Sequence, residues 1–144
     1  MIVQPVGRDI SIKKKKTLNM TLKNDKITIE ISSHGAELLS LKSEGREYIW
    51  NGDAAYWNRH APILFPAVGK PYHNTIRIDG QAYTMKQHGF ARDSEFEEVG
   101  DNTLRMLGAE GHDNYPYRYD LEAHYRLDGN TVEITWTVTN RDSR

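Results

Sequence analysis

Two short segments of the chain carry side chains that could bind a small polar molecule. The first spans residues 56–69 and reads Tyr-Trp-Asn-Arg-His-Ala-Pro-Ile-Leu-Phe-Pro-Ala-Val-Gly. Sugars present apolar C–H faces that stack on aromatic rings and hydroxyls that need directional donors, and Trp57, Asn58 and Arg59 offer both. An aromatic segment with two prolines also commonly packs as core, so by itself this segment leaves a structural role open.

The second segment spans residues 87–92 and reads Gln-His-Gly-Phe-Ala-Arg. Histidine is the side chain best able to exchange protons near neutrality, because its unperturbed pKa is about 6.5. Gly89 directly after His88 allows the chain to bend there. A lone histidine is nevertheless more often structural than catalytic, so the role of His88 stays open on this evidence alone.

The composition restricts the classes of partner and cofactor. The 144 residues suit one domain, and 19 Lys and Arg against 20 Asp and Glu leave a net charge of -1. No global field therefore attracts nucleic acid or an acidic membrane. The chain has no cysteine, and its six histidines form no short ligand pair, so we expect neither disulfides nor a metal site.

The N-terminal residues look separate from the domain. Residues 1–19 include the run Lys13 to Lys16 and show no clear period, which predicts an extension outside the fold. The alternative is a first strand that packs through Ile10 and Ile12. No stretch approaches the roughly 20 apolar residues that span a bilayer, and no signal-peptide pattern is visible, so we expect a cytoplasmic protein.

A period of two dominates the rest of the chain. Ile27, Ile29 and Ile31 alternate with polar residues, Leu39 and Leu41 continue the alternation, and residues 48–50 suggest another short strand. Hairpins are predicted for residues 75–78 with 82–85, 96–99 with 104–107, and 119–127 with 132–138. Because no sustained helical repeat occurs, the pattern predicts an all-β fold of antiparallel twisted sheets.

Four blocks in order resemble a known family. They are Ile-Glu-Ile-Ser-Ser-His-Gly-Ala-Glu-Leu at 29–38, Tyr-Ile-Trp-Asn-Gly at 48–52, Arg-His-Ala-Pro-Ile-Leu-Phe-Pro at 59–66, and the Gln-His-Gly-Phe-Ala-Arg block. Together they resemble the galactose mutarotase-like superfamily, and within it the bacterial aldose 1-epimerase-like proteins of the LacX type. The resemblance covers residues 20–144 and implies the N-terminal half of a β-supersandwich.

The resemblance also implies a function. Such proteins interconvert the α and β anomers of an aldose without a cofactor, and opening the ring requires an acid and a base on either side of C1. His88 matches the histidine that holds the sugar near its ring oxygen, while Arg59 and Lys70 lie where the family has a sugar-binding arginine. Relatives commonly have arginine at the position of Lys70, and lysine lacks the planar fork that grips two hydroxyls.

Several interpretations remain open. Arg92 could pair with Asp93 or Glu95, or it could face the cleft and meet a sugar phosphate, as in hexose-6-phosphate mutarotases. The family's second histidine, in a Gly-Gly-His-Pro-like segment, and its glutamate base have no counterpart, and neither His112 nor His124 sits in such a context. We therefore expect a truncated mutarotase. The alternatives are a non-catalytic carbohydrate-binding module and a half-domain that forms a homo-oligomer through exposed sheet edges.

Overall fold

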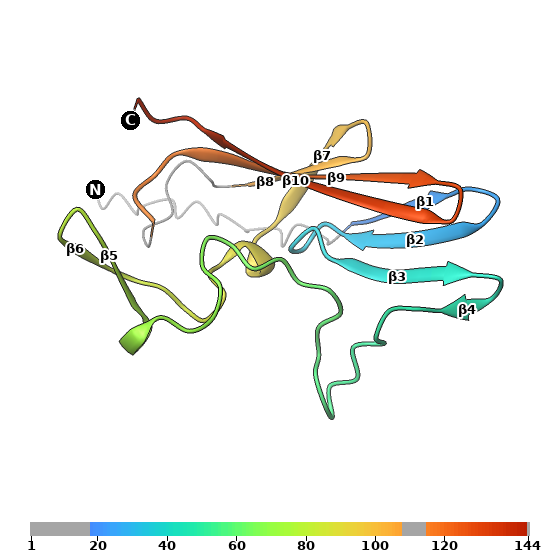
Figure 1. Cartoon of the computed structure of the whole chain (residues 1–144), viewed down its shortest axis with the longest axis horizontal. Helices are drawn as coiled ribbons and strands as arrows, with labels where there is room; N and C mark the ends of the chain where they lie inside the picture. Colours follow the sequence, from blue (N-terminus) through green and yellow to red (C-terminus); the bar gives the residue numbers. More distant parts are fainter. Residues whose placement is uncertain (1–17, 108–114, 144) are drawn as a thin grey trace, which may run out of the picture.

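The computed structural model describes residues 18–107 and 115–143, which form two four-stranded antiparallel sheets and a separate hairpin (Figure 1). The first sheet has the order β1-β2-β3-β4 and contains β1 (Asn19–Lys23), β2 (Ile27–Ser32), β3 (Leu38–Ser43) and β4 (Arg46–Glu47). The second has the order β10-β9-β8-β7 and contains β7 (Phe96–Gly100), β8 (Thr103–Met106), β9 (Tyr119–Asp128) and β10 (Thr131–Asn140). The predicted all-β class of antiparallel sheets is confirmed.

The remaining elements lie between these two sheets in the sequence. They are the hairpin of β5 (Thr75–Ile78) and β6 (Gln81–Thr84) and two single 3-10 turns, η1 (Tyr72–Asn74) and η2 (Ala91–Asp93). All three hairpins predicted from the alternating pattern are present, with ends shifted by one or a few residues. In Figure 1 the β5–β6 hairpin stands apart from the two sheets.

One core lies between the two sheets. It contains the predicted isoleucines of β2 together with apolar residues of β7, β8 and β9, namely Ile27, Ile29, Ile31, Phe96, Leu104, Met106, Tyr119, Leu121, Ala123 and Tyr125. Tyr125 also bridges the layers, because its hydroxyl donates a 2.7 Å hydrogen bond to the carbonyl oxygen of Ala36. Burial, and to a lesser extent the charge of Glu37, raises the pKa of Tyr125, so this hydroxyl stays a donor.

The alternation predicted for the third strand is interrupted by a β-bulge. Ile29 lies opposite Leu41, but the register shifts so that Ile31 lies opposite Leu38 and not Leu39. Leu38 is therefore buried at 5% exposure, whereas Leu39 is only half-buried. A bulge places one extra residue on one strand, which reverses the face that the following residues occupy.

The short strand predicted at residues 48–50 is wrong, because the fourth strand of the first sheet ends at Glu47. Oε1 of Glu47 accepts hydrogen bonds from the backbone N–H groups of Leu41 (2.8 Å), Ile49 (3.0 Å) and Tyr48 (3.1 Å). A side chain that takes several neighbouring N–H donors bends the chain away from a strand path.

The first described residues already belong to the first sheet. β1 begins at Asn19, one residue earlier than the predicted domain start, and the N–H of Leu18 donates to the hydroxyl of Ser33 at 3.0 Å. The predictions for residues 1–17 and for His112 lie outside the described residues. In residues 18–107 and 115–143, no helix is both long and apolar enough to cross a membrane.

Candidate functional site

Backbone contacts join the two segments that carry the candidate residues. Phe65 and Gly89 form an isolated parallel bridge, and the carbonyl oxygen of Phe65 accepts hydrogen bonds from the N–H groups of Phe90 (3.0 Å) and Ala91 (3.2 Å). Gly89 has a φ of +73°, and a Cβ there would lie 2.2 Å from that same oxygen. Only glycine allows this approach, which explains why the bend lies directly after His88.

Gly69 forms hydrogen bonds with both the backbone and the imidazole ring of His88. Its N–H donates to the carbonyl oxygen of Gly69 at 2.9 Å, and the N–H of Gly69 donates to Nδ1 of the ring, also at 2.9 Å. Because Nδ1 accepts, the neutral ring carries its proton on Nε2. The side-chain amide of Gln87 lies 3.2 Å from this nitrogen, and only the oxygen of that amide could accept a hydrogen bond from it. His88 has a φ of +66°, a left-handed conformation that costs free energy in a residue other than glycine.

A buried carboxylate positions the loop that contains Arg59. Glu37 is 7% exposed, and its Oε1 accepts hydrogen bonds from the N–H groups of His60 (2.6 Å) and Ala61 (2.9 Å). Sequence reasoning did not identify this residue. The signal that could have found it is a carboxylate between two apolar residues, Ala36 and Leu38, at the start of a strand, because a charge buried there needs donors.

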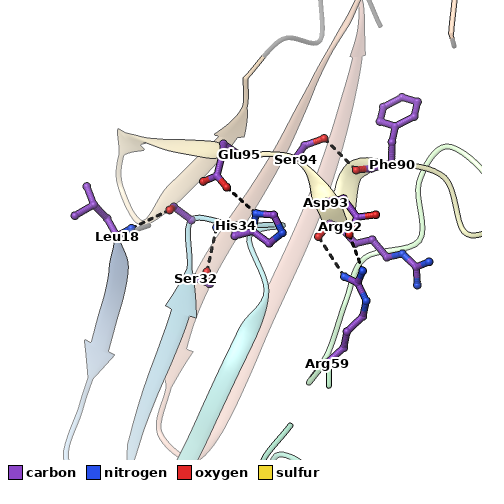
Figure 2. A network of polar contacts seen from close by, with 10 residues as sticks. Leu18, Ser32, His34, Arg59, Phe90, Arg92, Asp93, Ser94 and Glu95 are labelled. Carbon is purple, nitrogen blue, oxygen red and sulfur yellow. Dashed lines mark hydrogen bonds and ion pairs between the residues drawn. The ribbon is translucent and has the colours of Figure 1, made fainter. Parts of the chain in front are cut away.

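Arg59 reaches from its loop to the turn η2 (Figure 2). Nη2 of Arg59 lies 2.6 Å from Oδ1 of Asp93, and Nη1 donates to the carbonyl oxygen of Arg92 at 3.4 Å. The ion pair therefore ties the two binding segments together by their side chains as well as by their backbones. Both terminal nitrogens of the guanidinium take part in these contacts, so the side chain of Arg59 is held in one orientation.

Both carboxylates that could have paired with Arg92 have other partners. Asp93 pairs with Arg59, and Oε1 of Glu95 lies 2.6 Å from Nδ1 of His34 (Figure 2). Arg92 itself donates from Nη2 to the carbonyl oxygen of Gln87 at 2.8 Å, and its Nε is buried with no hydrogen-bond partner among the described residues. Arg92 therefore forms neither of the two ion pairs considered for it, and it lines the groove described next.

A groove of about 520 Å³ lies where the two segments meet. It is lined by Trp57, Arg59, Pro62, Leu64, Gln87, His88 and Arg92. Four of the six residues selected from the sequence thus share one groove. The other two, Asn58 and Lys70, are exposed and do not line it. The structure adds Gln87, which stood beside His88 in the sequence but was not selected.

The lining of the groove has the mixed character that a sugar site needs. Trp57 is 47% exposed and presents an aromatic face, while Arg59, Arg92 and the Nε2 atom of His88 provide hydrogen-bond donors. Among residues 18–107 and 115–143, no group of three or more His, Cys, Asp or Glu could hold a metal ion. The arrangement can therefore hold a polyhydroxylated ligand by stacking and by donors.

Comparison with known proteins identifies the family that the chain resembles in sequence. The family model for aldose 1-epimerase matches residues 19–144. Protein LacX of Lactococcus lactis subsp. lactis, in its plasmid and chromosomal forms, is 34% identical over an alignment of 142 positions, and the match covers 88% of this chain and 46% of the relative. The chain thus spans about half the length of the curated relatives it matches.

Solved structures show the same fold. A galactose mutarotase-like protein from Lactobacillus casei is 38% identical with a TM-score of 0.77, and the match covers 88% of this chain and 45% of that one. A galactose mutarotase related enzyme from Lactobacillus acidophilus is 33% identical with a TM-score of 0.78, and the match covers 85% and 43%. The fold is therefore part of a galactose mutarotase-like β-sandwich.

Proposed function

Because the chain belongs to the aldose 1-epimerase family, we propose that its groove binds an aldose and takes part in exchanging the α and β anomers of that sugar. The observation that carries the proposal is that Trp57, Arg59, His88 and Arg92 line one groove, although two separate segments of the sequence supply them. A binding site for a ring with one apolar face and several hydroxyls needs this combination.

His88 is the residue that we place nearest the reacting atoms. With Nδ1 occupied by the N–H of Gly69, Nε2 is the ring nitrogen that can donate a hydrogen bond to the ring oxygen of the sugar. Such a donor favours ring opening, because negative charge develops on this oxygen as the C1–O bond breaks. The left-handed backbone of His88 supports a functional role, since strain of this kind concentrates at active sites.

The other groups bind and orient the sugar. The indole of Trp57 provides a stacking face, and Arg59, held by Asp93, lines the groove with a guanidinium that can donate to sugar hydroxyls. We assign to the residues of this groove the holding of the sugar and the hydrogen bond to its ring oxygen.

A second candidate, a hexose 6-phosphate as the sugar, is favoured by Arg92. Its side chain lines the groove beside those of Arg59 and His88. A phosphate would supply acceptors for the planar fork of arginine, which binds such groups through two parallel hydrogen bonds. We expect Arg92→Gln to weaken binding of glucose 6-phosphate more than binding of glucose.

The test is a sugar titration followed by tryptophan fluorescence. Trp57 is half-exposed in the groove, and Nε1 of Trp50 donates to its carbonyl oxygen at 2.8 Å, so both indoles should respond to an occupied site. We expect saturable changes with glucose or galactose, and a loss of affinity of about tenfold or more in His88→Ala, as for loss of one good hydrogen bond. The control is His124→Ala, because His124 lies in β9 of the second sheet and does not line the groove.

The outcomes separate binding from turnover. No saturable change with any aldose or hexose 6-phosphate, or equal loss in the His88→Ala and His124→Ala variants, would remove the proposal. Polarimetry on a pure α-anomer then shows whether the same preparation accelerates anomer exchange. Saturable binding without acceleration would favour the non-catalytic carbohydrate-binding module.

A further inference from the structure

His88 lies in a tight turn whose type does not suit its residues. The turn comprises Lys86, Gln87, His88 and Gly89, and the N–H of Gly89 donates to the carbonyl oxygen of Lys86 at 3.0 Å. His88, the third residue, has a φ of +66°, whereas the φ of Gln87 is not positive. A positive φ at the third position alone defines a type II turn, which normally has glycine or asparagine there. Other residues favour type I, so contacts from outside the turn are needed to hold the observed type.

The central peptide group of this turn, between Gln87 and His88, is hydrogen-bonded at both ends. Its N–H belongs to His88 and donates to the carbonyl oxygen of Gly69 at 2.9 Å. Its carbonyl oxygen belongs to Gln87 and accepts from Nη2 of Arg92 at 2.8 Å. Types I and II differ in the orientation of this peptide group. Rotation to the type I orientation would break both hydrogen bonds, so the two partners together hold the type II turn.

The same peptide group determines how the imidazole ring is held. Gly69 accepts the N–H of His88 and returns its own N–H to Nδ1 of the ring, each at 2.9 Å. If the peptide rotates, the first of these bonds is lost, and the second loses the backbone contact that keeps Gly69 beside the ring. The tautomer and direction of the ring, and with them the position of Nε2, therefore depend on the peptide between Gln87 and His88.

Arg92 reaches this peptide from a turn that is itself fixed on two sides. It is the middle residue of η2 (Ala91–Asp93), and the N–H of Ala91 donates to the carbonyl oxygen of Phe65 at 3.2 Å. On another side, a Cβ at Gly35 would lie only 2.8 Å from the carbonyl oxygen of Arg92. The donor to the peptide is a charged guanidinium, and charge-assisted hydrogen bonds are roughly twice as strong as neutral ones.

We propose that Arg92 is a positioning residue for His88: its guanidinium holds the peptide between Gln87 and His88 in the type II orientation and so keeps the imidazole ring fixed in the groove. The proposal rests on the proposed function, in which Nε2 of His88 donates to the ring oxygen of the sugar. It differs from a contact between Arg92 and a phosphate, because it predicts an effect on sugars without phosphate. A guanidinium has five N–H donors, so one arginine can fill both roles.

A double-mutant cycle in glucose binding separates positioning from direct contact. Methionine keeps an apolar stem without donors, so Arg92→Met should weaken glucose binding about threefold to tenfold when His88 is present. In the His88→Ala background the same substitution should change the affinity by less than about twofold, because the side chain that Arg92 positions is gone. Equal losses in the two backgrounds, or no loss in either, overturn the proposal.

Amide hydrogen exchange, followed by NMR on the sugar-free protein, tests the positioning without any ligand. We expect Arg92→Met to speed exchange at the amides of Gly69 and His88 by about fivefold or more, as for loss of one hydrogen bond. The control is Arg105→Met, because Arg105 lies in β8 and pairs with Glu122 at 2.7 Å, away from the groove. Unchanged exchange in Arg92→Met, or equal acceleration in Arg105→Met, overturns the proposal.

The two measurements distinguish failure of this proposal from failure of the proposed function. A wild-type chain that binds no aldose removes the proposed function, while amide exchange still decides whether Arg92 holds the turn. Circular dichroism identifies an Arg92→Met variant that does not fold, and the wild-type chain then decides. Amides of Gly69 and His88 that exchange more slowly than that of Gly80, an exposed residue of the β5–β6 turn, support the proposal, and equally fast exchange overturns it.

Discussion

Substitution of Gly35 tests whether the tip of the β2–β3 turn must touch the turn that carries Arg92. Gly35 has a φ of +73°, and its N–H donates to the carbonyl oxygen of Ser94 at 2.8 Å. A Cβ at this position would lie 2.8 Å from the carbonyl oxygen of Arg92 and 3.2 Å from its Cα. These atoms belong to the backbone, so they cannot swing aside as the end of a flexible side chain could.

Gly45 is the matched control, because it has nearly the same φ of +78° but nothing within 4 Å of an added Cβ. Alanine in the left-handed region costs about 1–2 kcal/mol at either position. Overpacking against fixed atoms adds about 1–3 kcal/mol at Gly35 alone. We therefore expect Gly45→Ala to lower the free energy of unfolding by about 1–2 kcal/mol and Gly35→Ala by about 2–5 kcal/mol.

Urea denaturation followed by circular dichroism measures both values, provided that the transition is two-state. Displacement of the Arg92 carbonyl should also loosen Arg59, whose Nη1 contacts it at 3.4 Å. Sugar affinity should thus fall in Gly35→Ala and not in Gly45→Ala. Equal destabilisation by the two substitutions would refute the argument, because the conformational cost would then account for everything.

Two further predictions concern buried or strongly hydrogen-bonded carboxylates. Glu37→Ala removes the acceptor of two backbone N–H groups and should lower the free energy of unfolding, measured by urea denaturation, by about 3–5 kcal/mol. Glu37→Gln should lower it less, and Glu98→Ala, at an exposed position, should leave it almost unchanged. Equal effects of all three substitutions would contradict the role of Glu37 in positioning the loop. For Glu47, burial by itself raises the pKa, but hydrogen bonds from the Ser40 hydroxyl and three backbone N–H groups outweigh it and lower the pKa from 4.5 to about 2. Since this folded-state pKa is depressed, the stability that Glu47 contributes is present above pH 4.5 and is lost as the pH falls toward 2. Glu47→Gln should flatten this part of the acid denaturation curve, and an unchanged curve would argue against the depressed pKa.

Much of the fold followed from the alternation of apolar and polar residues. Ile27, Ile29 and Ile31 specify a half-buried strand because side chains alternate between the two faces with a period of two. The last hairpin was clear for the same reason, with a turn at Asp128-Gly129-Asn130. The bulge beside Leu38 could not be read from this pattern, since a register shift depends on the partner strand.

The candidate site was predictable as residue types but not as an arrangement. The chemistry of Trp57, Arg59, His88 and Arg92 could be recognised in the sequence, because aromatic faces, guanidinium groups and imidazole rings have intrinsic properties. Their meeting depends on contacts between distant residues. The ion pair of Arg59 with Asp93 joins positions 34 residues apart, and Lys70, which lay in the expected block, stays outside the groove.

The sequence by itself determined which segments become strands, which side chains can donate or stack, and to which family the chain is similar, because these depend on local spacing and residue type. Only the tertiary structure decided which partner each charged group takes and that Glu37 holds the loop of the groove. Those outcomes depend on which elements lie side by side, and the free energy of such contacts belongs to the packed chain as a whole.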